Sequence, residues 1–374
     1  MSYHESAIIA RNKDVEHIVN AAANLGVFGH GERKPKRFAM LVTTDVHRCA
    51  KQMQSAIDYL NGMDALDCGI CLGDIQGGNY TENDGSWYYL AVNSSNKPFY
   101  TTIGNHDGGN NVKKELCGTK AEVLEKYIRT TRTRIRIPDI DKTYYSVNWD
   151  EYKITLIVLD NYMAPENRNE NGDFVLHRGA ECLNQEEVDW LVETLANVPQ
   201  GYQVIIARHG YPDSVVKIEG DWTQEKGGFN GEEELYGKSD LVPDVVNAWV
   251  KGETLSKAYP PIEKYDWLPT LMVNADFTVR GEGVFVTYIV GHYHRDMIGK
   301  STVYPDQNVI SFAATANDDW QNFGCDLPRE RGTKAEDCVT VFALDSAKRR
   351  IHLVRVGSNF TDSLVDRTYT TINY

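Results

Sequence analysis

Histidine, aspartate and asparagine side chains recur in five short segments, which long apolar runs separate from one another. The segments are Asp45-Val-His47, Gly73-Asp74, Gly104-Asn-His106-Asp107, Arg208-His209 and Gly291-His292-Tyr-His294. They offer seven side chains with metal-ligating atoms and leave one further histidine over. Imidazole and carboxylate ligands together suit Mn, Fe, Zn or Ni better than Ca or Mg, which prefer shells of oxygen alone. The inventory therefore predicts a site for two divalent metal ions.

The chemistry that such a site supports is hydrolysis. Two divalent ions about 3.5–4 Å apart require a bridging carboxylate and about three further ligands each. The pair holds a phosphoryl oxygen, lowers the pKa of a bound water to form hydroxide, and stabilises the charge of an in-line displacement. A neighbouring imidazole can protonate the departing alkoxide. The residues thus indicate a metal-dependent phosphoric ester hydrolase.

Predicted strands place the five segments at one edge of the fold. Apolar runs predict strands that each end just before one segment: 38–43, 68–72, 99–103, 202–207 and 284–290. In layered α/β folds the loops at the carboxyl ends of strands converge and build the site. We therefore expect side chains up to about 250 positions apart to meet there.

Further elements complete an α/β pattern. The remaining strands are expected at 144–148, 154–159, 309–312, 339–344 and 351–356, and the helices at 14–25, 49–60, 112–130 and 184–196. The last helix has Asn184 as its N-cap and Glu187 at the capping-box position. Strands that alternate with helices and then pair as hairpins predict stacked sheets flanked by helices in a single domain.

The expected domain organisation has three parts. Residues 1–36 form an N-terminal helical extension, and residues 37–374 form the main domain. The stretch from about 213 to 280 differs in composition, with Gly-rich polar sequence, three tryptophans and four prolines. We interpret it as an insertion over one edge of the core, either a substrate lid or a self-packed excursion.

The acidic composition bears on partners and location. Lys plus Arg number 39 against 53 Asp plus Glu, so the formal net charge is −14. A protein of this charge repels a phosphate backbone at long range, which argues against nucleic acid as the main partner. We expect no secretory signal, because the first residues lack a basic segment followed by an apolar stretch, and no run approaches the roughly 18 apolar residues of a membrane span. With seven scattered cysteines, an odd number, these features predict a cytoplasmic protein without a membrane anchor.

The motif order D-x-H, G-D, G-N-H-D, H, G-H-x-H resembles the calcineurin-like metallophosphoesterase superfamily, and it spans residues 45 to 294. The resemblance implies a β-sandwich with helices on its outer faces, in αββα layers. It also implies two ligand sets that share one aspartate: Asp45, His47 and His294 for one ion, Asn105, His209 and His292 for the other, and Asp74 bridging them. His106 would be the general acid and would not bind metal.

Departures from other branches narrow the resemblance. Protein serine/threonine phosphatases carry Asp-Arg-Gly after the G-D motif and end the third motif in Glu, whereas this chain has Ile75-Gln-Gly77 and Asp107. Purple acid phosphatases place a tyrosine where this chain has Gly77. The nearest pattern is the bacterial and phage small-substrate phosphoesterase branch, which implies a small or medium phosphomonoester or phosphodiester as substrate.

Several further residues are candidates for supporting roles. Arg48 and Arg295 directly follow metal-ligand motifs and could bind the substrate phosphate, or could be solvated or ion-paired arginines. Asp107 would support the ligands without binding metal. Asp84 is a candidate to orient His106.

Two alternatives to the esterase remain open at this point. A DNA or RNA metallonuclease would share the motifs, and the basic run from Arg129 to Arg136 favours it, although near-alternation with Thr and Ile also fits the exposed side of an edge strand. A non-catalytic binding or structural protein could keep the fold. Such a protein is expected to have lost ligands, and here the set is complete.

Overall fold

The computed structural model of this chain describes residues 37–82, 85–131, 137–211, 215–219, 222–223, 235–236, 240–316, 336–357 and 369–374. Three expectations lie outside these residues: the N-terminal extension with its helix, the role of Asp84, and the edge strand at the basic run after residue 131. Among the described residues, no helix is both long and apolar enough to cross a lipid bilayer.

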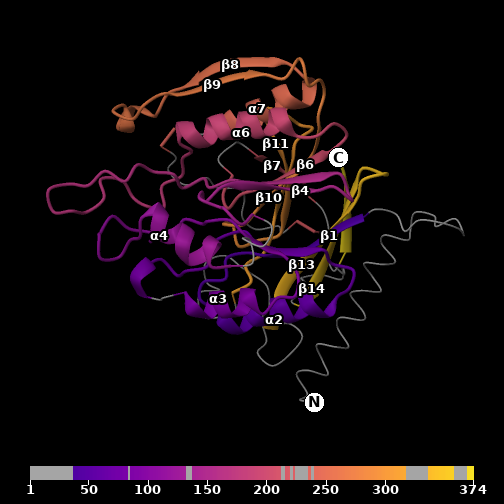
Figure 1. The fold of residues 1–374 in the computed structure, drawn as a ribbon, viewed down its shortest axis with the longest axis horizontal. Helices are drawn as coiled ribbons and strands as arrows, with labels where there is room; N and C mark the ends of the chain where they lie inside the picture. The colour runs from indigo at the N-terminus through magenta and orange to yellow at the C-terminus, as the bar shows by residue number, and fades with distance from the viewer. Residues whose placement is uncertain are drawn as a thin grey trace, which may run out of the picture.

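Two mixed sheets form the centre of the protein (Figure 1). The six-stranded sheet has the order β15 (Tyr369–Asn373), β14 (Arg350–Gly357), β13 (Cys338–Asp345), β1 (Arg37–Thr43), β2 (Cys68–Cys71) and β3 (Phe99–Thr101). Strands β1, β2 and β3 are parallel, and β13 joins β1 in antiparallel fashion. The parallel strands are buried along their length, as their continuous apolar runs require.

The seven-stranded sheet provides the other half of the sandwich. Its order is β4 (Tyr145–Trp149), β5 (Ile154–Val158), β6 (Gln203–Ala207), β10 (Val284–Val290), β12 (Asn308–Ser311), β11 (Met297–Ser301) and β7 (Val215–Lys217). Strands β5, β6, β10 and β12 are parallel, so their carboxyl ends share one edge.

Aromatic side chains join the two sheets across the core. The ring of Trp149 on β4 lies 5.4 Å from that of Phe38 on β1 and 6.4 Å from that of Tyr100 on β3, centroid to centroid. The hydroxyl of Tyr145 accepts a hydrogen bond from the backbone N–H of Thr101 at 2.9 Å. These contacts fix the strands that precede the site loops relative to one another.

Helices cover both outer faces (Figure 1). Helices α2 (Ala50–Gly62) and α3 (Ser86–Asn93) lie on the six-stranded sheet, and α6 (Gln185–Asn197) and α7 (Leu241–Lys251) lie on the seven-stranded sheet. A hairpin of β8 (Thr254–Tyr259) and β9 (Leu271–Asp276) lies beyond α6 and α7. The predicted α/β sandwich flanked by helices is therefore confirmed.

Two local predictions about helices are wrong in part. The helix expected at 112–130 begins only at residue 120, as α4 (Lys120–Leu124) followed by a π-helical turn (Glu125–Arg129). Thr119 and Glu122 form a capping box that fixes this start, while Asn111 Oδ1 accepts from the N–H groups of Val112 and Lys113 in a turn.

The second correction concerns the cap of α6. Asn184 caps the helix as predicted, since its side chain accepts from the Glu187 N–H at 2.8 Å. The Glu187 carboxylate does not complete a capping box. It accepts instead from the backbone N–H of Asp160 at 2.8 Å, because the helix start is packed against the end of β5.

Candidate metal centre

The loops that follow β1, β2, β3, β6 and β10 bring the five predicted segments to one edge of the sandwich. The loop after β1 is bonded to the loop after β2, with the Asp45 N–H donating to Gly73 O at 2.9 Å and the His47 N–H to Asp74 O at 3.0 Å. Five of the predicted ligands adopt positive φ, a conformation that costs energy for residues other than glycine: Asp45, His47, Asp74, His292 and His294. Such strain persists where the surrounding structure holds it and is frequent at functional sites.

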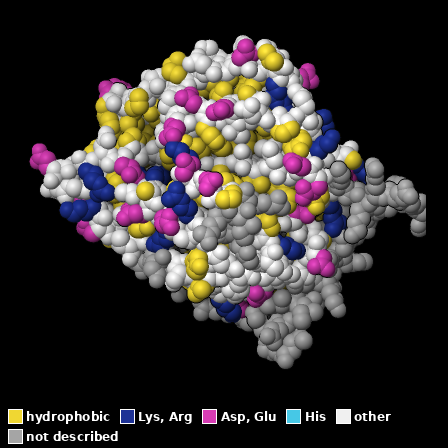
Figure 2. Space-filling view, viewed as in Figure 1, with side chains coloured by type: hydrophobic (Ala, Val, Ile, Leu, Met, Phe, Trp, Pro, Cys, Tyr) yellow, Lys and Arg dark blue, Asp and Glu magenta, His cyan; other side chains and the backbone are white. Residues whose placement is uncertain are grey.

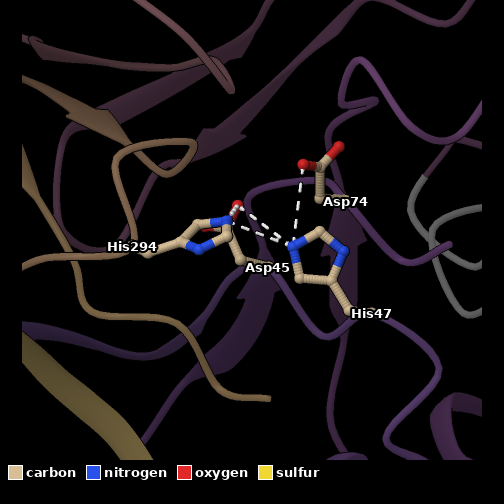
Figure 3. Close-up of side chains that lie close together, drawn as sticks. All are labelled: Asp45, His47, Asp74 and His294. Atoms are coloured by element: carbon tan, nitrogen blue, oxygen red, sulfur yellow. Dashed lines mark hydrogen bonds and ion pairs between the residues drawn. The ribbon is translucent and has the colours of Figure 1, made fainter. Parts of the chain in front are cut away.

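One group of ligand atoms gathers around Asp45 (Figure 3). His294 Nε2 lies 3.2 Å from Asp45 Oδ1 and 3.1 Å from His47 Nε2. His47 Nε2 is 4.0 Å from both Asp45 Oδ1 and Asp74 Oδ2. The ligand atoms of these four side chains all lie within 4.8 Å of one another, so they could hold a metal ion.

A second group shares Asp74 with the first. His209 Nε2 lies 3.2 Å from Asp74 Oδ2, and His292 also contributes to this group. The side-chain amide of Asn105 lies 3.2 Å from both His209 Nε2 and His292 Nδ1. The structure thus brings all seven predicted ligands into one cluster with Asp74 between its two halves. We call them the Asp45 half (Asp45, His47, His294) and the Asn105 half (Asn105, His209, His292).

Backbone carbonyls fix the orientation of two of the imidazoles. His47 Nδ1 lies 3.0 Å from Gln76 O, and His209 Nδ1 lies 2.6 Å from Leu72 O. A ring that donates its Nδ1 proton to a carbonyl is held with its Nε2 atom toward the carboxylates, and this Nε2 can bind a metal ion when it gives up its proton. Sequence reasoning missed these two carbonyl groups, because a backbone acceptor leaves no trace in residue type.

The electrostatics of the cluster favour positive charge. Burial disfavours a charged His209 ring, yet Asp74 and Asp45 outweigh it and raise the pKa of His209 to about 10. The pKa of Asp45 falls to about 2 although burial opposes ionisation, because His294 and His209 lie beside it. Burial lowers the pKa of His292 to about 4, which keeps its ring neutral and able to bind a metal ion.

These residues fit a pair of divalent transition-metal ions. Asp45 Oδ1 is buried and accepts no hydrogen bond from the described residues. Around it the Asn105 amide and the imidazole nitrogens of His47, His209, His292 and His294 converge at separations of 3.1–3.2 Å. A cation satisfies such a convergence of lone pairs, and the mixture of nitrogen and oxygen matches Mn, Fe, Zn or Ni.

His106 and Asp107 flank the cluster in different environments. The His106 side chain is 23% exposed, its Nε2 lies 3.8 Å from Asp74 Oδ2, and its backbone N–H donates to Asp74 Oδ1 at 2.9 Å. Asp107 is fully buried and accepts from the N–H groups of Ile75, Gln76 and Gly104 at 2.7–3.0 Å. Asp107 therefore ties the loop after β2 to the loop after β3.

The two candidate phosphate-binding arginines lie on loops beside the cluster. A Cβ atom placed on Gly77 would lie 2.7 Å from Arg48 Nη2, so the guanidinium occupies the space that a side chain at position 77 would fill. Arg295 is half-buried in the loop between β10 and β11, and its carbonyl oxygen accepts from Ser311 Oγ at 2.8 Å.

Residues behind the Asn105 half also escaped prediction. Asn161 Oδ1 accepts from the His209 N–H at 3.3 Å, and Arg208 pairs with Glu181 at 3.0 Å. All three side chains are buried. Arg208 was visible only as the residue before His209, and no motif contains Asn161 or Glu181.

The solved structures that match this chain are only distantly similar to it. A structure of PhoD is 10% identical, with a TM-score of 0.47, covering 92% of this chain and 70% of that chain. A predicted phosphoesterase from Streptococcus pneumoniae is 8% identical, with a TM-score of 0.33 over 90% of this chain and 98% of that chain. For a 5'-nucleotidase precursor from Thermus thermophilus the identity is 9% and the TM-score 0.39, over 82% of this chain and 51% of that chain.

Sequence comparison identifies the family of this chain more clearly than these structures do. No curated protein matches the chain. Residues 38–296, more than half of the chain, match the family described as calcineurin-like phosphoesterase. The matched range contains all seven side chains of the cluster and the strands that precede the site loops. The chain therefore belongs to the calcineurin-like phosphoesterase family, with its cluster of metal-binding aspartates and histidines in place.

Proposed function

We propose that this protein hydrolyses a small or medium phosphoric ester, either a monoester or a diester, by in-line displacement at phosphorus. The observation that carries the proposal is the assembly of seven ligand side chains from five loops around the shared carboxylate of Asp74. In this proposal Asp45, His47 and His294 hold one ion, and Asn105, His209 and His292 hold the other. When bound, the ions supply positive charge that acidifies a water nucleophile and offsets charge on the phosphoryl oxygens.

The protein's own groups divide the remaining work. The carbonyl groups of Leu72 and Gln76 hold His209 and His47 with their Nε2 atoms toward the centre. His106 is the residue that donates a proton to the departing oxygen, because its ring is partly exposed beside Asp74. Arg48 and Arg295 contact the phosphate from the loops that follow β1 and β10, where a guanidinium can pair with two oxygens at once.

Surface charge favours a small substrate over a nucleic acid. The net charge is −14, and on the face in Figure 2 the described Lys and Arg side chains are interspersed with Asp and Glu instead of forming a continuous band. Nucleic-acid binding relies on a basic surface that tracks the phosphate backbone. The non-catalytic alternative loses support because no ligand of the set is missing.

The direct test is hydrolysis of p-nitrophenyl phosphate and bis-p-nitrophenyl phosphate by protein loaded with Mn²⁺. We expect turnover of at least one ester. Asp74→Asn should lose it, whereas Asp276→Asn, at an exposed aspartate on β9 outside the five site segments, is the matched control and should retain it. No turnover of either ester by protein loaded in turn with Mn²⁺, Fe²⁺, Zn²⁺ and Ni²⁺ would refute the proposal.

The role of His106 has a sharper test. His106→Ala should slow hydrolysis of an alkyl phosphate ester by about 10²–10⁴-fold, because an alkoxide departs poorly without a proton. The same variant should slow the p-nitrophenyl esters much less, since p-nitrophenolate departs unprotonated. Equal losses on both esters would assign His106 a different role.

A further inference from the structure

The segment between β5 and α6, residues 159–184, is long and contains no helix or strand. We call it the β5–α6 loop. Loops of more than about 12–15 residues without secondary structure are uncommon in compact domains and are often functional. Isolated bridges, one of which pairs Tyr162 with Cys182, close this loop at its base. The loop therefore has a defined path beside the carboxyl ends of β5 and β6.

Glu181 is the centre of a buried polar group at the base of this loop. It is 4% exposed, and its Oε1 accepts from Arg208 Nη2 at 3.0 Å and from Asn161 Nδ2. Arg208 and Asn161 are almost completely buried as well. Burial raises the pKa of the Glu181 carboxyl, and the charge of Arg208 opposes that rise. A buried carboxylate of this kind depends on its partners.

Both partners of Glu181 act on the turn that carries His209. Arg208 is the residue before His209 in the chain, and Asn161 Oδ1 accepts from the His209 N–H at 3.3 Å. Gly210 follows, and a Cβ atom there would lie 3.0 Å from Glu181 Oε1. The carboxylate of Glu181 thus pairs with Arg208, before His209, and lies against Gly210, after it. It also holds Asn161, which accepts from the backbone N–H of His209.

The same loop contacts a second ligand of the Asn105 half. A Cβ atom placed on Gly179 would lie 3.0 Å from Asn105 O and 3.1 Å from Asn105 Cβ. The backbone of the β5–α6 loop at Gly179, two residues before Glu181 in sequence, therefore packs directly on Asn105. The loop thus contacts Asn105 directly and the His209 turn through Asn161 and Glu181.

We propose that Glu181 is a positioning residue that sets the metal affinity of the Asn105 half, by holding the His209 turn through Arg208 and Asn161. The inference rests on the metal assignment made under the proposed function. Groups that orient metal ligands without binding the metal typically change its affinity by 10–100-fold when they are removed. Among the described residues, no hydrogen bond or ion pair joins Glu181 to Asp45, His47 or His294, so the affinity of that half should change little.

Mn²⁺ titrations of metal-free protein test this without any ester, with free Mn²⁺ followed by its electron paramagnetic resonance signal. Glu181→Ala should raise one of two Kd values by about 10–100-fold and leave the other within about threefold. Glu181→Gln should give a smaller rise, because an amide oxygen can still accept from Asn161 and Arg208. If Glu181→Ala fails to fold, Glu181→Gln alone decides the outcome, and an unchanged pair of Kd values would overturn the proposal.

Two further variants identify the position and the specificity of the effect. In the His294→Ala background, which removes a ligand of the Asp45 half, Glu181→Ala should still raise the Kd of the remaining ion. Glu166→Ala is the matched control, because Glu166 pairs with Arg178 at 3.0 Å in the same loop. Equal weakening of both ions by Glu181→Ala, or the same effect from Glu166→Ala, would overturn the proposal. Since only metal is measured, a protein that binds two ions but cleaves no ester would refute the proposed function and leave this inference intact.

Discussion

His47 and His209 both direct an Nε2 atom toward Asp74, but different kinds of structure hold the two rings. His47 lies in the loop after β1, where Gln76 O from the loop after β2 holds its Nδ1 and Asp74 O accepts from its backbone N–H. His209 also has a carbonyl partner, yet its turn depends on a buried carboxylate and arginine. The His47 ring is thus held by the backbone of a neighbouring site loop, whereas the His209 turn depends on buried side chains, Glu181 and Asn161, that no motif contains.

The largest expected effect comes from the residue that the two halves share. Asp74→Asn removes a charged ligand from both, so Mn²⁺ binding should weaken at both positions. Ester hydrolysis should fall by about 10³-fold or more, since several kcal/mol of charge stabilisation is lost. Parallel measurements of Mn²⁺ binding and turnover check this. Loss of only one bound ion would show that Asp74 belongs to one half alone.

The Asp45 half has one distant support, and removing it tests whether that half depends on its loops alone. Asp296 follows His294 by two residues, is buried, and pairs with Arg355 on β14. Arg355→Met removes the buried ion-pair partner of this carboxylate, which costs about 3–5 kcal/mol and should lower the Tm by roughly 5 °C.

Calorimetry at fixed Mn²⁺ concentration measures this effect. The double variant Asp296→Asn with Arg355→Met removes both charges and should recover part of the loss. A Tm for Arg355→Met equal to that of the wild type would contradict the assignment of a supporting role to β14.

A smaller effect is expected from crowding the β5–α6 loop. Gly179→Ala places a Cβ atom 2.6 Å from Asn110 Oδ1 and 3.0 Å from Asn105 O, so the loop must shift at an expected cost of about 1–3 kcal/mol. The Kd of one Mn²⁺ ion should rise by about tenfold. Gly108→Ala is the control, because its nearest neighbour is 3.9 Å away. If both alanines weakened metal binding equally, the close approach of Gly179 to Asn105 would not explain the effect.

The smallest effect concerns the buried carboxyl group of Glu187, near the start of α6 where the β5–α6 loop ends. Burial and the charge of Asp160 raise the pKa of Glu187 well above its ordinary value. A raised pKa in the folded state gives stability that is complete below the unfolded pKa and is lost as pH rises through the folded pKa. The Glu187→Gln variant has no ionisable group at this position. The Tm of the variant minus the Tm of the wild type should therefore rise by about 2 °C or more from about pH 5 to about pH 8. Calorimetry of both proteins with saturating Mn²⁺ checks this, and a constant difference would contradict a raised pKa.

The contrast between the two halves also explains what the sequence could predict. Apolar runs that end in Asp, Asn or His gave the strands and the ligand residues, because strand burial and ligand chemistry both depend on residue type. Asp107 was predicted to support the ligands, and its three bonds to backbone N–H groups place it between two site loops. Sequence alone could not give Glu181, whose partner Arg208 is 27 residues away and whose loop has no periodicity.

The helix expected from residue 112 shows a second limit of prediction from sequence, because it begins only at residue 120. Thr119 and Glu122 had the capping-box spacing in the sequence, but the apolar pattern from residue 112 obscured that start. The turn at Asn111 depends on a side chain bonding to its own backbone neighbours, and the β5–α6 loop packs against it through Arg178. The capping box at Thr119 therefore sets where the helix begins, and the packed turn at Asn111 keeps residues before it out of the helix.

Anomalous scattering from crystals of the Mn²⁺-loaded protein tests the central claim most directly, because it locates each ion among named side chains. We predict two peaks, one among Asp45, His47 and His294 and one among Asn105, His209 and His292, with Asp74 between them. A single peak, or a second ion bound elsewhere, would contradict a shared two-ion centre.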